Sequence, residues 1–141
     1  MKAVVFDKFG GPEVMRYVDL PMPTPGPGEV LVKMMSAGVG KPDWRVRTGR
    51  CQWLTVPFPV TLGYEMAGRI EALGPGVEDF KVGQPVHVLH MACHGTYAEY
   101  MAVTADDVVD LPEGLDYDAA AGAFNYFVAW GLLHEIVQAQ K

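Results

Sequence analysis

The sequence predicts a mainly β fold that is followed by one or two helices. Up to residue 115, short runs of β-compatible residues are separated by turns, and the chain holds 16 glycines and 11 prolines. From Asp116 the sequence becomes alanine-rich, with apolar residues at helical intervals through Val137. We therefore expect β structure over residues 1–115 and helices over residues 116–141.

Composition narrows the class of protein. The 141 residues, half of them hydrophobic and 20% charged, are enough for one folded domain. The net charge of −6 and the lack of a basic run argue against nucleic acid as a partner. No apolar stretch approaches a membrane span, and the first residues lack the apolar core of a signal peptide. Cys51 and Cys93 make no disulfide framework, so we expect a cytoplasmic protein.

The first elements follow from apolar runs and from proline. Residues 1–6 and 14–20 are predicted strands. The stretch PMPTPGPGE is a predicted loop with a turn at Pro27 and Gly28, because its prolines remove hydrogen-bond donors and fix φ. Residues 29–38 alternate only partly, which favours a strand buried on much of both faces.

A short helix and several further strands are predicted next. Residues 42–48 can form the helix, with Pro42 in its first turn and Gly49 as its stop. The stretch LGYEMAGRIEALGPGVEDFKVGQPV then reads as a strand, a turn-rich excursion and a second strand, punctuated by five glycines that permit positive φ or close backbone approach. Strands over residues 86–89 and 96–103 follow, and one short and one longer helix complete the chain.

Seven segments in order carry a resemblance: MKAVVFDKFGGPEV, PGPGEVLVK, SAGV, PDWRVRTG, LGYEMAG, GPGVEDFKVGQPV and GTYAEYMAV. Together they resemble the GroES-like catalytic domain of the medium-chain dehydrogenase/reductase superfamily, in the zinc-independent quinone oxidoreductase branch related to ζ-crystallin. The resemblance implies a partly open β-barrel over residues 1–115. It also implies NAD(P)H-dependent reduction of quinones or α,β-unsaturated carbonyls by hydride transfer in the full-length enzyme.

Members of this superfamily carry a Rossmann domain after the helices, with a glycine-rich phosphate loop. No G-x-G-x-x-G motif occurs in this chain, which stops about where the first Rossmann strand would begin. The resemblance therefore makes residues 116–141 linking helices at the start of a missing cofactor-binding domain. We expect NADPH or NADH to be bound mainly by that domain, and the 141-residue chain alone to be inactive. The alternative is a stand-alone GroES-like binding or structural module without catalysis.

The resemblance also implies that no zinc is bound. Zinc-dependent relatives place a cysteine and a histidine where this chain has Gly40 and Tyr64, and neither replacement is a suitable ligand. A rival metal site consists of closely spaced borderline ligands, although the first two point to opposite faces of a strand: His87, His90, Cys93 and His94.

Tyr64 is the predicted catalytic residue. Its neutral hydroxyl is a donor that could stabilise an enolate or hydroquinone oxygen as hydride arrives. The alternative role, a tyrosine that packs in the barrel wall, has equal weight. Glu65 is expected to be structural, with its carboxylate satisfied by a nearby backbone or basic group.

Other site residues are carried over from the resemblance. Substrate contacts are expected at Gly40, Trp44, Arg45 and Tyr126, with Trp44 as an apolar platform or simply a packing residue. Cofactor contacts are expected at Gly40 and Val128. Many relatives have asparagine and threonine at these two positions, so the polar contacts of those side chains are absent here, which favours the non-catalytic alternative.

The longer C-terminal helix is predicted to be apolar nearly all round. One face carries Phe124, Phe127, Val128 and Leu132, and another carries Tyr126, Trp130, Leu133 and Val137. The barrel can cover only one face, so the second is expected to drive homo-oligomerisation or to need the missing cofactor domain. The other expected partner is a small-molecule quinone or enone, and no membrane contact is expected.

Overall fold

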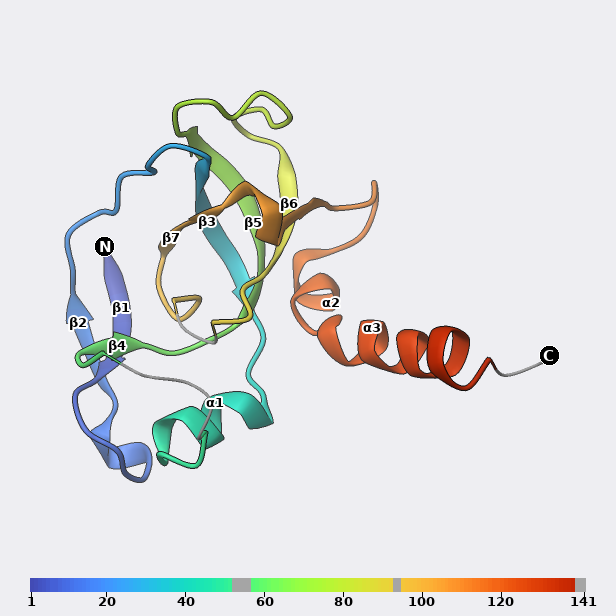
Figure 1. The fold of residues 1–141 in the computed structure, drawn as a ribbon. Helices are drawn as coiled ribbons and strands as arrows, with labels where there is room; N and C mark the ends of the chain where they lie inside the picture. The colour runs from blue at the N-terminus through green and yellow to red at the C-terminus, as the bar shows by residue number, and fades with distance from the viewer. Residues whose placement is uncertain (52–56, 93–94, 139–141) are drawn as a thin grey trace.

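Two antiparallel sheets form the body of the protein (Figure 1). The computed structural model describes residues 1–51, 57–92 and 95–138. The three-stranded sheet has the order β2 (Arg16–Asp19), β1 (Lys2–Phe6) and β4 (Val60–Thr61). The five-stranded sheet has the order β7 (Tyr100–Thr104), β3 (Glu29–Ala37), β5 (Glu65–Leu73), β6 (Pro85–Leu89) and β8 (Val108–Asp110).

The segment that precedes β7 joins the two sheets. The amide of Val4 in β1 donates to the Tyr97 carbonyl at 2.9 Å, and the Glu99 amide donates to the Lys2 carbonyl at 3.0 Å. The Glu99 carbonyl in turn accepts from the amide of Met34 in β3 at 2.9 Å. No ladder between β1 and β3 themselves is present in the described parts of the chain, so the barrel is partly open, as predicted.

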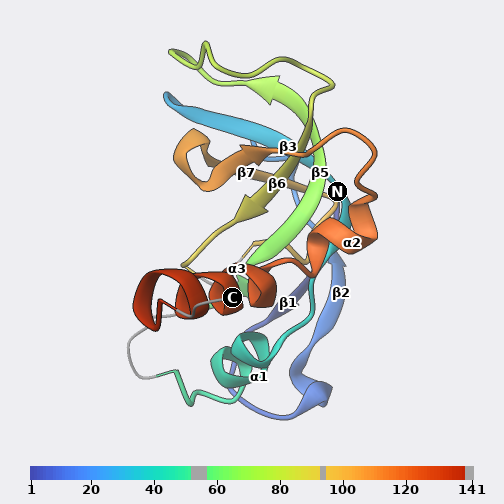
Figure 2. The same ribbon diagram turned by 90° about the vertical axis from the view of Figure 1, so that its right-hand side faces the viewer.

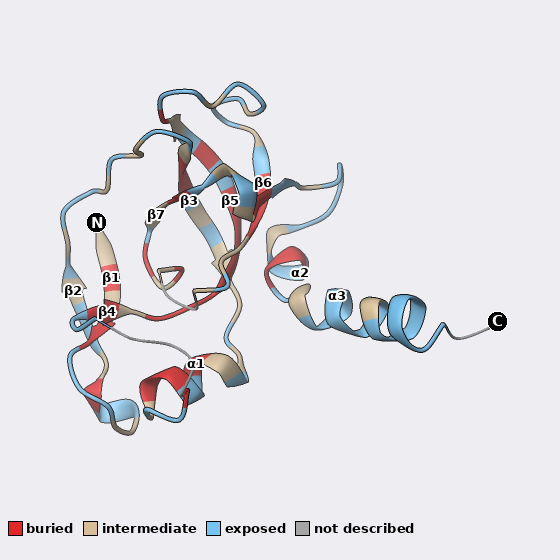
Figure 3. Ribbon diagram, in the orientation of Figure 1, coloured by how far each residue is buried: buried red, intermediate tan, exposed pale blue. Residues whose placement is uncertain are grey.

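Two apolar clusters fill the barrel, and Figure 3 places most buried residues on its strands. The first lies between the strands of the larger sheet: Val30, Val32, Met66, Ile70, Val86, Val88, Met101, Val103 and Val108. The second lies toward α1 (Lys41–Arg47): Phe6, Val14, Val46, Cys51, Val60, Leu62 and Tyr64. In β3 the consecutive residues Val30, Leu31 and Val32 are all buried, which confirms burial on both faces for the first half of that strand.

Two glycines illustrate how the chain around β5 and β6 is held. Gly68 lies where β5 runs against β3, and a Cβ there would overlap the carbonyl oxygen of Lys33. Gly83, just before β6, has φ of +86°, which few other residues adopt. The glycine spacing therefore reflects the geometry of the paired strands.

Caps and glycine stops define the helices. The Gly40 amide donates to Asp43 Oδ2 at 2.7 Å at the start of α1, and Gly49 adopts φ of +71° after its end. Asp116 caps α2 (Tyr117–Ala121), because its carboxylate accepts from the Asp118 amide at 2.8 Å. α3 (Phe124–Gly131) continues into a π-helical turn, η3 (Leu132–Ile136). Short 3₁₀ turns are η1 (Pro12–Val14) and η2 (Ala105–Asp107).

Several boundaries differ from the predictions. β2 starts at Arg16 because residues 12–14 form η1, and β7 starts at Tyr100, with only an isolated bridge at Ala98 before it. The strands β4 and β8 have two and three residues, too few for a sequence pattern.

The largest difference concerns α3. This helix projects from the barrel (Figures 1 and 2), and none of its residues is buried. Phe124 is partly covered, but Phe127, Val128 and Leu132 are 43–53% exposed. The barrel therefore covers less than the one face that it was expected to be able to cover, because contact is limited to the first turn. None of the described helices combines the length and apolarity that a bilayer crossing requires.

Candidate active site around Tyr64

Tyr64 enters the protein interior at the start of β5 and is only 3% exposed. Its ring packs edge-to-face on Phe124, with the centroids 5.2 Å apart. Its hydroxyl lies against Gly40: a Cβ built on Gly40 would be 2.5 Å from the hydroxyl oxygen. Positions 40 and 64 therefore face each other, and the phenol occupies the room that a side chain at position 40 would need.

Glu65, the next residue, is buried at 3% exposure and is fully held by its neighbours. Its Oε2 accepts a hydrogen bond from the Phe124 amide at 3.0 Å. Burial raises the pKa of the Glu65 carboxyl, while the bonds from the Phe124 amide and the Tyr64 hydroxyl act in the opposite direction. The predicted structural role of Glu65, with its carboxylate satisfied by backbone, is confirmed.

A second carboxyl–phenol pair, Asp43 and Tyr97, lines one pocket together with Gly40. Asp43 is 5% exposed, and burial raises the pKa of its carboxyl despite hydrogen bonds that include the Gly40 amide. Burial and then the Asp43 charge raise the pKa of the Tyr97 phenol, so it stays protonated. Among the described residues, Asp43 Oδ1 and the Tyr97 hydroxyl are buried and neither has a hydrogen-bond partner.

Asp43 and Tyr97 were not predicted as site residues. The only signal for Asp43 is its place in the first turn of α1, three residues after Gly40, where a carboxylate can accept from the N-cap amide. Tyr97 lies in a separate segment of the chain, and nothing in the sequence indicates that it meets Asp43.

A pocket of about 160 Å³ brings two predicted substrate residues together. Gly40 and Trp44 both line it, together with Val39 and Tyr97. Trp44 is 40% exposed, and the guanidinium carbon of Arg50 lies 4.9 Å from its ring centroid. Trp44 thus offers an aromatic surface beside Gly40, although one of its neighbours is a cation.

The remaining predicted site residues lie elsewhere on the surface. The side chain of Arg45 is exposed on α1 and is not among the residues that line the Gly40 pocket. Tyr126 and Val128 lie on α3 and are 77% and 43% exposed. Their contacts with substrate and cofactor remain predictions.

The rival metal cluster is not assembled in the part of the chain that the structure describes. His87 is buried at 3% exposure on β6 and packs on Phe127, whereas His90 Nδ1 lies 2.6 Å from Asp107 Oδ2. Cys93 and His94 lie outside the described residues. Among those described, no group of three or more potential metal ligands occurs, and the absence of zinc remains a prediction.

Residues 26–113 match the alcohol dehydrogenase GroES-like domain. The chain belongs to this family. Within it the chain falls in the quinone oxidoreductase branch of the medium-chain dehydrogenase/reductase superfamily, as the resemblance implied. A quinone oxidoreductase of Sus scrofa is 39% identical over 137 residues, which cover 95% of this chain and 41% of the relative.

Solved structures agree with the GroES-like fold. A quinone oxidoreductase of Pseudomonas syringae superposes with a TM-score of 0.88 at 31% identity, over 99% of this chain and 42% of that one. An Escherichia coli quinone oxidoreductase complexed with NADPH gives 0.88 at 27% identity, over 100% of this chain and 42% of that one. The GroES-like chain therefore spans about two fifths of the length of these relatives.

Proposed function

We propose that this chain is the catalytic-domain portion of an NAD(P)H-dependent oxidoreductase that reduces quinones or α,β-unsaturated carbonyls by hydride transfer. The proposal includes a cytoplasmic location and a small-molecule substrate. It assigns residues 1–115 to the catalytic domain and residues 116–141 to helices that lead into a cofactor-binding domain. The names of the relatives, quinone oxidoreductases from animals and bacteria, support this reading.

The observation that carries the proposal is the contact between Gly40 and the Tyr64 hydroxyl. Because Gly40 has no side chain, the Tyr64 hydroxyl is the polar side-chain group nearest to where a Cβ at position 40 would lie. The residue that follows Tyr64 in the chain is the buried Glu65. A phenol hydroxyl can donate to an oxygen on which negative charge develops, which is the requirement for reducing a carbonyl without a metal.

NAD(P)H, when bound, would supply a hydride, so that the carbonyl system would gain two electrons and one hydrogen from the cofactor and a second hydrogen as a proton. In this scheme Tyr64 donates a hydrogen bond to the oxygen as it becomes negative. The neighbouring Glu65 is buried, which raises the pKa of its carboxyl, and its Oε2 accepts from the Phe124 amide, so its role here is structural. Trp44 would lie beside the substrate as an aromatic surface.

The described residues fit only one wall of a nicotinamide site. Gly40 contributes backbone without a side chain to the wall of its pocket, and Val128 contributes an exposed apolar side chain. A pyrophosphate needs a glycine-rich loop at a helix N-terminus, and the sequence contains no such motif. NADPH or NADH would thus be held mainly by residues outside this chain.

Replacing Tyr64 by phenylalanine in the full-length enzyme tests the role of the hydroxyl. We expect kcat to fall by about 10- to 1,000-fold with little change in stability, because the lost donor acts in the transition state. Tyr117→Phe, in α2, is the matched control and should leave turnover unchanged. A Tyr64→Phe enzyme with full turnover would return Tyr64 to a packing role in the barrel wall.

The alternative function is a GroES-like binding or structural module without catalysis. It is favoured by Gly40 and Val128, which lack polar side chains where many relatives have them. The two proposals differ in what the gene product does with reduced nicotinamide and a quinone. Oxidation of NAD(P)H that depends on the quinone supports the enzyme, whereas its absence in a folded full-length protein supports the module.

A further inference from the structure

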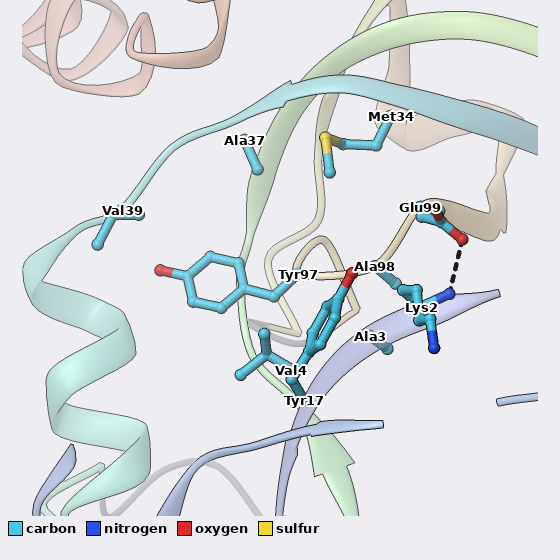
Figure 4. Close-up of a pocket in the computed structure, with 10 residues that line it drawn as sticks. All are labelled: Lys2, Ala3, Val4, Tyr17, Met34, Ala37, Val39, Tyr97, Ala98 and Glu99. Atoms are coloured by element: carbon cyan, nitrogen blue, oxygen red, sulfur yellow. Dashed lines mark hydrogen bonds between the residues drawn. The ribbon is translucent and has the colours of Figure 1, made fainter. Parts of the chain in front are cut away.

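A second, larger pocket shares lining residues with the Gly40 pocket, and Figure 4 shows the residues that line it. Its volume is about 270 Å³, and its walls come from β1, β2, β3 and the segment before β7. The apolar lining includes Val4, Met34 and Ala37, with the rings of Tyr17 and Tyr97. No role at this pocket follows from the proposed chemistry at Tyr64.

Two residues belong to both pockets. Val39 and Tyr97 line the Figure 4 pocket and also the Gly40 pocket. In Figure 4 the Tyr97 hydroxyl points toward Val39, so these side chains stand at the junction. Val39 is 84% exposed although it is apolar and directly precedes Gly40. A ligand seated beside Gly40 and extending past Val39 would cover this side chain.

The charges at the far end of the larger pocket are already paired. The Lys2 ammonium lies 2.6 Å from the Asp19 carboxylate, and the Glu99 carboxylate accepts the Lys2 amide at 2.6 Å. Neither group is left to attract an ion. The pocket therefore suits an uncharged, apolar group rather than a phosphate or a carboxylate.

We propose that the Figure 4 pocket binds an apolar substituent of the substrate, such as an alkyl side chain, while the carbonyl ring lies in the Gly40 pocket. This inference rests on the proposed reduction of quinones or enones, and it adds a preference for substrates with a hydrocarbon tail. Ligand pockets commonly span about 300–1,000 Å³. Each pocket alone falls below that range, and only the two together reach it.

Binding to the 141-residue chain tests the proposal without requiring turnover. The probes are tetramethyl-1,4-benzoquinone and its analogue with one methyl replaced by a pentyl chain, because fully substituted rings do not add to thiols. We expect the pentyl compound to bind at least ~10-fold more tightly, since four more methylenes become buried. Its tail should shift the methyl signals of Met34 and Ala37 in NMR spectra, whereas the ring of either compound should shift the Gly40 amide.

Two variants locate the tail. Tyr17→Ser changes only the larger pocket at a side chain that is 71% exposed, so the fold should persist, and it should remove most of the preference for the pentyl compound. Val39→Ser should weaken binding of the pentyl compound by about threefold or more. Val82→Ser is the matched control, because Val82 is 66% exposed and lines neither pocket; it should change nothing.

The outcomes distinguish failure of the tail site from failure of the proposed quinone or enone reduction. Equal affinity for the two quinones, with shifts at Gly40 for both, would overturn the tail site and leave the proposed function standing. Tighter binding of the pentyl compound with shifts confined to α3 would also overturn it, because an exposed apolar helix would then be the binding surface. If neither quinone shifts the Gly40 amide, both the tail site and the proposed substrate class are wrong.

Discussion

Gly40 and Tyr64 share one small volume of the protein, and this restricts both positions. The residue at position 40 has an ordinary φ of −135°, so the demand for glycine comes from space and not from backbone conformation. The nearest atom is the hydroxyl of a tyrosine that is 3% exposed and has little freedom to move aside. Overpacking of such a site costs about 1–3 kcal/mol.

We therefore expect Gly40→Ala to lower the free energy of unfolding by about 1–3 kcal/mol. Chemical denaturation followed by circular dichroism measures the loss. Gly122→Ala is the control, because a Cβ there meets no atom within 4 Å. The double variant Gly40→Ala/Tyr64→Phe should regain part of the loss, since it removes the oxygen that the new methyl meets. Equal stabilities for Gly40→Ala and wild type would contradict this account of position 40.

His87 is the buried polar side chain whose environment is most clearly unfavourable. Neither ring nitrogen has a hydrogen-bond partner in the described structure, and the ring packs on Phe127 with the centroids 5.8 Å apart. Asp110 lines the same small cavity, but its carboxylate already accepts from Gln84. Burial lowers the pKa of His87 below its ordinary value of 6.5.

Stability should fall in acid because of His87. Below pH 6.5 the unfolded chain binds a proton at this histidine that the folded chain does not bind. The free energy of unfolding therefore decreases by up to about 1.4 kcal/mol per pH unit until the folded-state pKa is reached. Asp43 and Glu65 act with the opposite sign, because their raised pKa values favour the folded form as they protonate. The difference between wild type and His87→Leu from pH 8 to pH 5 isolates the histidine.

His87→Leu should remove the decrease in the free energy of unfolding that His87 causes between pH 6.5 and pH 5. The exposed His134 is the matched control, and His134→Leu should behave like wild type. A wild-type protein no less stable at pH 5 than His87→Leu would show that the imidazole is charged or solvated in the folded state.

Individual site residues could be predicted only where a motif placed them. The resemblance located positions 40 and 64 because each lies in or next to a short sequence segment of the family, and the structure brings the two positions together. Asp43 and Tyr97 were missed because their relation depends on the path of the chain between α1 and β7. Packing of Tyr64 in the barrel wall was one of its two predicted roles, and the sequence could not choose between them because a tyrosine at a strand start can face in or out.

At the level of elements, a hydrogen bond and a ring contact tie the start of α3 to the barrel, whereas α2 packs on β5 through the buried Ala120 and Ala121. Glu65 lies on β5, and its acceptor oxygen holds the amide of Phe124, the first residue of α3. Since the other α3 residues are not buried, this bond and the Phe124 ring packed on Tyr64 fix where the helix starts.

Glu65→Ala should loosen α3 and lower stability by about 1–3 kcal/mol, because the Phe124 amide loses its partner while still partly buried. Hydrogen exchange of the Phe124 amide should become much faster. Glu65→Gln keeps an acceptor oxygen and should retain most of the protection. Glu71→Ala, an exposed position on the same strand, should change stability by less than about 0.5 kcal/mol. Unchanged exchange in Glu65→Ala would mean that α3 is anchored by packing alone.

The order of elements was predictable, and the errors have a common cause. Long runs with flanking glycine or proline gave β3, β5, β6 and the helices nearly at their observed positions. The very short strands β4 and β8 exist because a neighbouring strand supplies their partners, and that information is tertiary. The projection of α3 is tertiary too, since periodicity identifies apolar faces but not what covers them.

At the scale of the whole molecule, the exposed apolar surface is concentrated on one helix. Eight large apolar residues of α3, η3 and the residue after them are 43–77% exposed: Tyr126, Phe127, Val128, Trp130, Leu132, Leu133, Ile136 and Val137. Figure 3 shows this helix as mostly exposed, away from the buried strands. Contiguous apolar surface on this scale marks an interaction site.

The 141-residue chain should therefore not behave as a clean monomer. In sedimentation velocity at low micromolar concentration we expect dimers or larger species. The double variant Leu133→Glu/Ile136→Glu should shift the chain toward monomer, because charges on that surface resist burial. Val82→Glu, at an exposed position in a turn, should have no effect. A monodisperse wild-type monomer would show that the helix is covered in some other way.

The segment around Tyr97 to Glu99 also has a consequence for how the domain folds. Because β1 and β3 are connected through residues 97–99, β1 meets this partner only after nearly a hundred more residues have been made. Such distant pairing requires a long loop to close before its contacts stabilise anything. The barrel would then close late, and nascent chains that end before residue 97 would expose the edges of β1 and β3 to chaperones or to aggregation.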